Sequence, residues 1–217
     1  MSDNLKREAA LAALEEIRDG MVVGLGTGST ASIFIRELGK AGRQVLGIPT
    51  SEESGRIAAE VGVRLTTFSE HPVIDVTVDG ADEVSPELHL TKGLGGALVR
   101  EKIVAHASTR VVIIVDETKL VQKLGSKAVI PVEVIPLAVP RILLQLKQAA
   151  VRQKNGKPFI SDNGNNILDW KSGPLDDPAA VEKELKAMTG VVDSGIFANV
   201  ANVVIVAGSS GIQRKGK

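Results

Sequence analysis

The sequence predicts an α/β protein: a Rossmann-like main domain built on a parallel sheet, with a small α+β domain of the ferredoxin-like type inserted into it. Three observations indicate this class. Short β-branched runs alternate with amphipathic segments through the first half of the chain, which is typical of a parallel sheet covered by helices. A glycine-rich turn at residues 24–28 joins the first such run to a helix. After residue 129 prolines cluster, and the order of predicted elements becomes β, α, β, β, α, β.

The main domain is expected over residues 1–128 and 200–217. Ser2 or Asp3 is expected to cap a first helix that ends near residues 19–20, and Ser29 or Thr30 to cap a second. The run VVIIV at residues 111–115 is continuous and β-branched, as a sheet buried on both faces requires. The other expected elements are helices at 51–61 and 96–107 and strands at 21–25, 45–48, 63–67, 73–78 and 203–207.

The inserted domain is expected over residues 129–199. Its predicted strands are residues 132–135, 159–161, 167–170 and 191–197, and its predicted helices are residues 142–153 and 178–188. The strand at 203–207 would then return to the main sheet, which makes the second domain an insertion.

Composition narrows the class of partner to a small molecule. The 26 basic and 26 acidic residues cancel, so there is no electrostatic footprint for nucleic acid or an anionic membrane. Aromatic residues make up only 2% of the chain, which removes the usual stacking platform for single-stranded nucleic acid. No apolar run reaches the roughly 18 residues of a membrane helix. The N-terminal segment also lacks the apolar core of a secretory signal, so cytoplasmic residence is expected.

The segment GLGTGST, residues 24–30, predicts a phosphate site. Backbone N–H groups around Gly28, the helix dipole, and the hydroxyls of Thr27, Ser29 and Thr30 together suit an anion at the start of a helix. The alternative is an ordinary tight turn with a helix cap. The segment is neither a dinucleotide fingerprint, because Ser29 stands where glycine would be needed, nor a Walker loop, because no GK[ST] ends it.

Two aspartates follow the predicted strand at residues 73–78. Asp79 and Asp82, in DGADEV, stand at the carboxyl edge where open parallel sheets bind ligands. They could hydrogen-bond sugar hydroxyls or hold Mg²⁺. The alternative is a turn whose Asp and Gly only satisfy the backbone.

Lys92 precedes the glycine loop, defined as residues 93–96, which leads into a predicted helix. A lysine on such a loop is suited to steadying phosphate or a developing oxyanion.

Glu101 lies on that predicted helix. It shares a face with apolar residues one turn before and one turn after it, so its pKa should tend upward, which suits a general base. The alternative is a glutamate at the rim of a surface helix, favoured by the helix dipole. The apolar neighbours are Ala97, Leu98, Val104 and Ala105.

No metal site is expected. The chain has no cysteine, and His71, His89 and His106 are scattered without a metal-binding spacing, so each histidine is interpreted as structural. Trp170 is interpreted as a packing residue.

Several ordered motifs together resemble the ribose-5-phosphate isomerases of the A type, over nearly the whole chain. They are GLGTGST (24–30), DGADEV (79–84), KGLGGALVREK (92–102), DETK (116–119), PVEVIP (131–136), DNGNNILD (162–169) and GVVDSGIFA (190–198). The resemblance implies aldose–ketose isomerisation of ribose 5-phosphate to ribulose 5-phosphate in the pentose phosphate pathway. It further implies that no cofactor or metal is needed and that the protein is a homodimer or homotetramer.

The resemblance also implies roles for individual residues. Glu101 would transfer the proton, through a cis-enediol(ate), with Lys92 or backbone N–H groups stabilising the oxyanion. Asp79 or Asp82 would shuttle the hydroxyl proton or assist ring opening. The substrate-binding positions would be Thr27, Gly28, Ser29, Thr30, Asp79, Gly80, Ala81, Asp82, Lys92, Gly93, Leu94, Gly95 and Lys119.

Two other classes of function remain open at this point. A sugar-phosphate-sensing domain would keep the phosphate turn but would not need Glu101 and Lys92, and would normally follow a DNA-binding segment. A nucleotide-dependent oxidoreductase would need an intact dinucleotide fingerprint. Neither is favoured by the motifs.

Overall fold

The computed structural model describes residues 2–216, and the chain divides into two compact units. The first unit comprises Met1–Ala81, Arg100–Lys119 and Val200–Lys217, and the second comprises Asp82–Val99 and Leu120–Asn199. The sequence analysis assigned residues 82–99 and 120–128 to the main domain, whereas their contacts lie with the second unit. Five of the predicted site residues therefore belong to the second unit: Asp82, Lys92, Gly93, Leu94 and Gly95.

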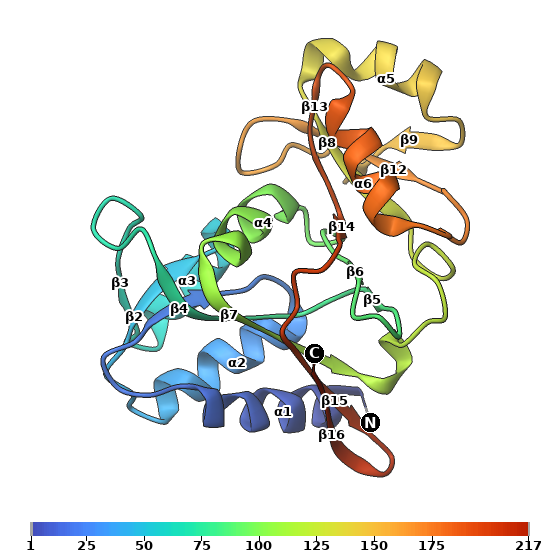
Figure 1. The fold of residues 1–217 in the computed structure, drawn as a ribbon. Helices are drawn as coiled ribbons and strands as arrows, with labels where there is room; N and C mark the ends of the chain where they lie inside the picture. The colour runs from blue at the N-terminus through green and yellow to red at the C-terminus, as the bar shows by residue number, and fades with distance from the viewer. Residues whose placement is uncertain (1, 217) are drawn as a thin grey trace. The chain divides into compact units, whose positions relative to one another are not determined.

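The first unit is built on a seven-stranded sheet in the order β16-β15-β7-β4-β1-β2-β3 (Figure 1). All neighbouring pairs are parallel except β15 with β16, which is antiparallel. Leaving out β16, this is the 3-2-1-4-5-6 order of a doubly wound sheet, so the predicted Rossmann-like class is confirmed. The strands are β1 (Val22–Leu25), β2 (Leu46–Pro49), β3 (Arg64–Leu65), β4 (Ile74–Asp79), β7 (Ser108–Asp116), β15 (Val203–Gly208) and β16 (Gly211–Gly216).

Helices cover both faces of this sheet because successive strand residues point to opposite sides. Val23 and Leu25 of β1 lie in one core cluster with side chains of the first three helices, whereas Val22 packs on the other side with Val104 of α4. The helices are α1 (Ser2–Ala13), α2 (Ser29–Lys40), α3 (Glu52–Glu60) and α4 (Leu98–His106), with 3-10 turns η1 (Leu14–Glu16) and η2 (Glu117–Lys119). The first residues of α4 belong to the second unit and the rest to the first.

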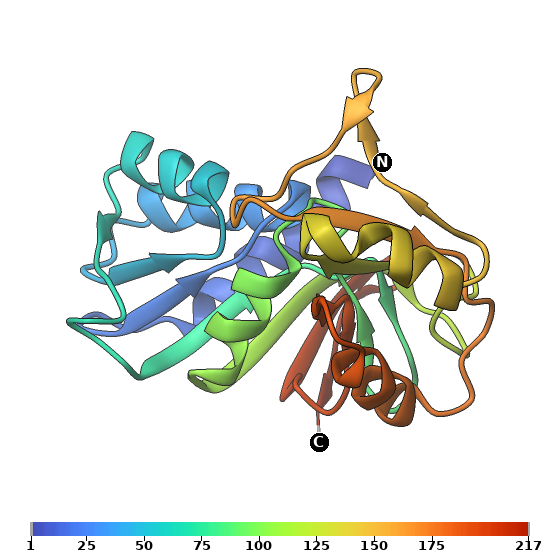
Figure 2. The same cartoon turned by 90° about the horizontal axis from the view of Figure 1, so that it is seen from above.

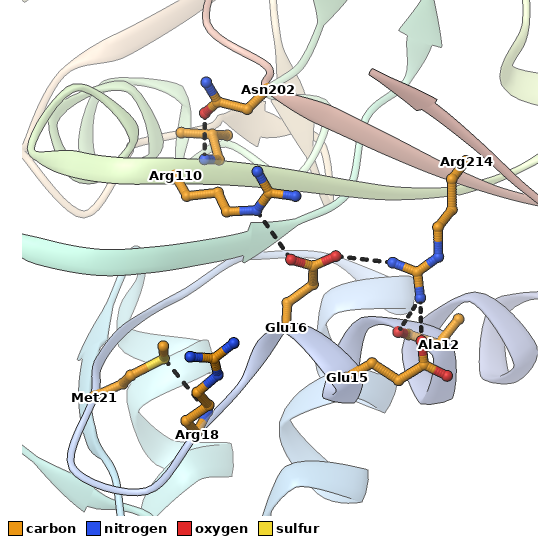
Figure 3. Close-up of polar contacts among 9 residues, drawn as sticks. Ala12, Glu15, Glu16, Arg18, Met21, Arg110, Asn202 and Arg214 are labelled. Carbon is orange, nitrogen blue, oxygen red and sulfur yellow. Dashed lines mark hydrogen bonds and ion pairs between the residues drawn. The ribbon is translucent and has the colours of Figure 1, made fainter. Parts of the chain in front are cut away.

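Charged contacts tie the C-terminal edge strand to the first helix and its following turn (Figure 3). Arg214 of β16 donates hydrogen bonds to Glu16 Oε1 (2.8 Å) and the Ala12 carbonyl (3.1 Å), and it also pairs with Glu15. The second oxygen of Glu16 accepts from Nε of Arg110 in β7 (2.9 Å). Glu16, in the turn η1 after α1, thus links the edge strand β16 with the neighbouring part of the sheet at β7.

The second unit contains a four-stranded antiparallel sheet in the order β13-β8-β12-β9. With helices after its first and third strands, this is the βαββαβ arrangement of a ferredoxin-like unit, as predicted. Its strands are β8 (Ile130–Val134), β9 (Ala149–Val151), β12 (Asn166–Trp170) and β13 (Val191–Ser194), and its helices are α5 (Val139–Gln145), preceded by the turn η3 (Pro136–Ala138), and α6 (Pro178–Ala187). Both helices pack on the apolar face of the sheet with Val132, Val134 and Leu168.

Two smaller elements complete the second unit. A three-stranded sheet in the order β14-β6-β5 is formed by β5 (Glu83–Val84), β6 (Leu90–Thr91) and β14 (Ile196–Phe197). A hairpin formed by β10 (Gln153–Lys154) and β11 (Lys157–Pro158) extends from the four-stranded sheet (Figure 2).

Several predicted boundaries are wrong. The helix expected over 142–153 ends at Gln145, because Gln148 adopts a left-handed backbone (φ 64°) and residues 149–151 pair with β12 instead. Residues 159–161 form no named strand and contribute only an isolated bridge from Ile160 to Asn166. The expected strand at 191–197 is two strands, β13 and β14, in different sheets. Sheet pairing overrides local propensity in these segments.

The end of the first helix and the N-cap of the second also differ from expectation. The first α-helix ends at Ala13, earlier than residues 19–20, and continues only as a 3-10 turn. Gly28, not Ser29 or Thr30, is the N-cap of α2, and no side chain caps that end.

No helix within residues 2–216 combines the length and apolar character needed to cross a membrane.

Candidate active site

The glycine-rich turn lies at the end of β1, at the point where the strand order reverses between β1 and β4. The Gly26 N–H donates to the Val78 carbonyl of β4 (3.0 Å), and Gly28 has a φ of 103°, a backbone conformation that favours glycine. With no side-chain cap on α2, the anion-binding end of the helix dipole is left to a ligand or water. Ser29 is exposed and Thr30 is half-buried.

The hydroxyl of Thr27 is engaged by neighbours within the first unit. Its Oγ1 lies 2.7 Å from Oγ1 of Thr50 and 2.8 Å from Oγ of Ser51, and Ser51 caps α3. The side chain of Thr27 therefore holds the turn in shape. The hydroxyls of Ser29 and Thr30, together with the backbone N–H groups, are the better candidates for direct contact with an anion.

Asp79 ends β4 and is only 2% exposed. Its Oδ1 accepts hydrogen bonds from the backbone N–H groups of Thr27 (3.1 Å) and Gly80 (2.7 Å). The carboxylate is thus fixed against the glycine-rich turn, so two motifs that lie 52 residues apart in sequence meet here. Gly80 and Ala81, which follow directly, are both half-buried.

Asp82 and Lys92 flank a short hairpin in the second unit. Strands β5 and β6 pair Glu83 with Thr91, and the Asp82 N–H donates to the Thr91 carbonyl (2.7 Å), so Asp82 and Lys92 follow as the next opposed pair. The Lys92 N–H donates to the Gly195 carbonyl (2.8 Å). The hairpin therefore places a carboxylate and a buried lysine side by side, at the ends of two paired strands.

The hairpin is anchored by Glu83, a fully buried carboxylate that the sequence analysis did not single out. Its oxygens accept from Oγ1 of Thr91 (2.9 Å) and from the backbone N–H groups of Gly125 (2.6 Å), Lys127 (2.6 Å) and Ala128 (3.0 Å). Four donors satisfy the buried charge, so Glu83 has a structural role next to the site. In the sequence Glu83 follows Asp82 in DGADEV, and nothing in that local pattern distinguishes it from a surface charge.

The glycine loop turns sharply after Lys92. Gly93 and Gly96 have φ values of 97° and 88°, and the Leu94 N–H donates to Oδ2 of Asp82 (3.1 Å). Leu94 and Gly95 are exposed, and Leu94 takes part through its backbone. Within the second unit, the structure thus brings together Asp82, Lys92 and the loop.

Glu101 lies on α4 and is 4% exposed. The predicted apolar face is confirmed as buried: Ala97, Leu98, Val104 and Ala105 are each among the buried core residues.

Lys119 ends η2, is half-buried, and belongs with Asp79 and Glu101 to the first unit. The predicted site residues thus form two groups, one in each unit. No group of three or more metal-ligating side chains occurs among residues 2–216.

The sequence analysis also missed Arg152 and Asp169 of the second unit. Arg152 donates to the carbonyls of Gly93 (2.9 Å) and Leu94 (3.0 Å) and forms an ion pair with Asp169. Arg152 was placed within a predicted helix, where nothing in the local pattern distinguishes it from a surface arginine.

Proteins of one family resemble this chain over nearly its whole length. The family model described as ribose 5-phosphate isomerase A (phosphoriboisomerase A) matches residues 46–211. Ribose-5-phosphate isomerase A of Methanothermobacter thermautotrophicus is 49% identical, with 97% of this chain and 96% of that protein covered. The corresponding protein of Gloeobacter violaceus is also 49% identical, over 97% and 95% of the two chains.

Two solved ribose-5-phosphate isomerase structures also match the chain over its whole length or nearly so. A D-ribose-5-phosphate isomerase in complex with phospho-erythronic acid superposes with a TM-score of 0.97 at 41% identity, and both chains are covered completely. Ribose 5-phosphate isomerase A from Methanocaldococcus jannaschii superposes with a TM-score of 0.93 at 42% identity, covering 99% of each chain.

Proposed function

The chain belongs to the ribose 5-phosphate isomerase A family, and from this premise we propose how its residues divide the work of the reaction. The reaction is the interconversion of ribose 5-phosphate and ribulose 5-phosphate, an aldose–ketose isomerisation. It moves one proton between neighbouring carbons and one between the two oxygens attached to them. A base for the carbon-bound proton and donors for the oxyanion are therefore the essential groups.

Glu101 is the proposed base, and its burial is the observation that carries the assignment. A carboxylate only 4% exposed, on a helix whose positions one turn before and one turn after it are buried apolar residues, is shielded from bulk water. In the proposed mechanism its carboxylate removes the proton from C2 of the open-chain aldose, leaving a cis-enediol(ate). The resulting carboxylic acid returns the proton to C1, which gives the ketose.

The remaining groups handle the oxygens and the phosphate. Lys92 and backbone N–H groups of the glycine loop are proposed to stabilise the oxyanion, and Asp79 or Asp82 to transfer the hydroxyl proton or assist ring opening. The turn at residues 26–30 is proposed to bind the phosphate together with Lys119. Support for this comes from the uncapped start of α2 and the fixed backbone of the turn.

The test is the variant Glu101→Gln, which keeps the size of the side chain but cannot accept the proton. We expect kcat to fall by about 10²-fold or more, the usual contribution of general-base catalysis, while KM changes little. Exchange of the C2 proton with solvent deuterium should be lost together with turnover. Glu184→Gln, on the exposed side of α6, is the matched control. Near-full kcat in Glu101→Gln would instead assign the base to Asp79 or Asp82.

A sugar-acid phosphate gives an independent check. Phospho-erythronic acid, the compound in the complex named above, carries a carboxylate where the enediolate would carry its oxygens. We expect it to inhibit competitively and to bind Glu101→Gln more tightly than the wild-type enzyme, because the variant lacks the negative charge that repels the ligand's carboxylate. Unchanged affinity for the variant would argue that the carboxylate of the ligand does not lie near Glu101.

We also propose that the chain forms a homodimer or homotetramer. Leu137 and Leu144, on η3 and α5, are 92% and 75% exposed, which is unusual for two leucines so close in sequence and favours an interface with a second copy. Leu137→Glu with Leu144→Glu should lower the mass measured by light scattering, and an unchanged mass would exclude this surface. Residence in the cytoplasm stays a prediction from the sequence.

A further inference from the structure

We propose that Arg152 and Phe159 are positioning residues for the reaction: they hold the glycine loop, residues 93–96, in the conformation that orients Asp82. The inference rests on the proposed function, in which this loop contacts substrate. All of the residues involved belong to the second unit, so the geometry that supports it lies within one compact body.

The guanidinium of Arg152 is the first point of contact. Its Nη1 donates to two successive carbonyls of the loop, those of Gly93 (2.9 Å) and Leu94 (3.0 Å). Two bonds from one nitrogen fix the planes of two successive peptide groups, because each peptide group is rigid. Arg152 therefore sets the shape of the loop between Gly93 and Gly95.

Asp169 holds that guanidinium in place. Nε of Arg152 lies 3.1 and 3.0 Å from the two carboxylate oxygens, and Nη2 pairs with Oδ1. The Arg152 side chain is only 11% exposed, and its backbone N–H donates to the Ile167 carbonyl of β12 (2.8 Å). A planar fork with several donors can bind a carboxylate and two carbonyls at once, whereas a lysine ammonium is a point charge without this geometry.

One peptide group connects Arg152 to the proposed proton-handling carboxylate. The carbonyl of the Gly93–Leu94 peptide is bound by Arg152, and the N–H of the same peptide donates to Oδ2 of Asp82 (3.1 Å). Hydrogen bonds in series polarise one another, so a guanidinium on the carbonyl makes the N–H a stronger donor. Arg152 thereby positions Asp82 without touching it.

Phe159 covers the other end of the loop. A Cβ atom on residue 96 would lie 2.4 Å from Cζ of Phe159, so the ring packs directly on the Gly96 backbone. Gly96 also has a φ of 88°, and both facts require glycine at this position. The Phe159 N–H donates to the Arg152 carbonyl (2.8 Å), and the guanidinium lies 5.9 Å from the ring centroid. The two residues flank the β10–β11 hairpin and act on the same loop.

The experiment compares Arg152→Lys, Arg152→Met and Phe159→Leu with Arg141→Met, an exposed arginine of α5 that serves as a matched control. We expect kcat/KM of Arg152→Lys to fall by up to about 10²-fold, the cost of a displacement near 1 Å, with most of the loss in kcat. The melting temperature should stay close to wild type in Arg152→Lys, because its cation can still pair with Asp169. Arg141→Met should match wild type in both measurements.

Hydrogen–deuterium exchange tests the loop without relying on activity. In the Arg152 variants and in Phe159→Leu, the peptide that contains the amides of Leu94 and Gly95 should exchange faster, while peptides from β8 and β12 should not. In Arg152→Ala, guanidinium at low millimolar concentration should restore part of the lost kcat and slow this exchange, whereas ammonium should do neither. A wild-type protein without isomerase activity would refute the proposed function, yet the exchange result would still stand.

Three outcomes would overturn the inference. Wild-type kcat/KM with wild-type loop exchange in Arg152→Lys would show that the guanidinium geometry is not needed. Faster exchange spread evenly over the four-stranded sheet would show a general structural role. Loss of activity that appears only as a raised KM, with an unchanged loop, would move Arg152 to substrate binding.

Discussion

Gly26 and Asp79 lie so close together that a Cβ atom on residue 26 would come within 2.2 Å of Oδ1 and 2.6 Å of Cα of Asp79. The contact joins the turn after β1 to the end of β4, the two adjacent strands at which the strand order reverses. Because part of the clash is with backbone, a small rotation of the Asp79 side chain could not relieve it. The glycine is therefore a requirement of the site.

The variant Gly26→Ala should lose stability and activity together. Overpacking of this kind typically costs about 1–3 kcal/mol, and the displaced Asp79 would no longer meet the Thr27 N–H. Gly55→Ala is the matched control, since a Cβ there would meet Pro49 at an ordinary 3.4 Å and alanine favours a helix interior by roughly 0.5–1 kcal/mol. Urea denaturation should show opposite signs for the two variants. Equal stability of both would contradict the close approach of Gly26 and Asp79.

Two buried glutamates of the second unit should respond differently to the same substitution. Both oxygens of Glu83 accept from backbone N–H groups, so an amide in either orientation turns an NH₂ toward a donor. Glu83→Gln should therefore leave at least one buried donor unsatisfied, at a cost of about 1–3 kcal/mol.

Glu133 offers the contrast. Its Oε1 accepts from Ser161 (3.0 Å), Asn163 (3.0 Å) and Asn165 (2.9 Å), whereas its Oε2 has no hydrogen-bond partner among the described residues. In Glu133→Gln the amide oxygen can take the place of Oε1 and keep all three bonds. The free energy of unfolding in urea should fall less than in Glu83→Gln, and the reverse order would contradict this account.

The phosphate-binding turn can be tested through affinity. Ser29→Ala combined with Thr30→Ala should raise KM more than it lowers kcat, since these hydroxyls are proposed to bind the phosphate and not the reacting carbons. Inorganic phosphate and arabinose 5-phosphate should compete with substrate in the wild type and less effectively in the double variant. Unchanged KM and unchanged inhibition would place the phosphate elsewhere.

Activity should not depend on a metal ion. Asp79 and Asp82 are the carboxylates that could hold Mg²⁺. However, Oδ1 of Asp79 accepts hydrogen bonds from two backbone N–H groups, which favours a role for Asp79 as a fixed hydrogen-bonding group. We expect full turnover in EDTA after dialysis. Activity that disappears in EDTA and returns with Mg²⁺ would make the two aspartates ligands.

Local sequence was enough to predict the parts of this protein whose structure depends on residues near one another in the chain. The turn at residues 24–28 is an example, because a β-branched run, closely spaced glycines and an amphipathic helix specify strand, turn and helix with little outside help. The buried face around Glu101 followed from helical spacing in the same way. The family, and with it the reaction, followed from several such motifs in order.

Tertiary structure decided what depends on pairing between distant segments. Residues 149–151 have helical propensity, but their hydrogen bonds to β12 make them a strand, and the helix before them ends early. Glu83 and Arg152 look like surface charges in the sequence. They are buried or nearly so because the chain folds donors from residues 125–128 around the first and the carbonyls of the glycine loop around the second. A hydrogen bond between residues 59 positions apart leaves no periodic trace in the sequence, so only the folded chain reveals it.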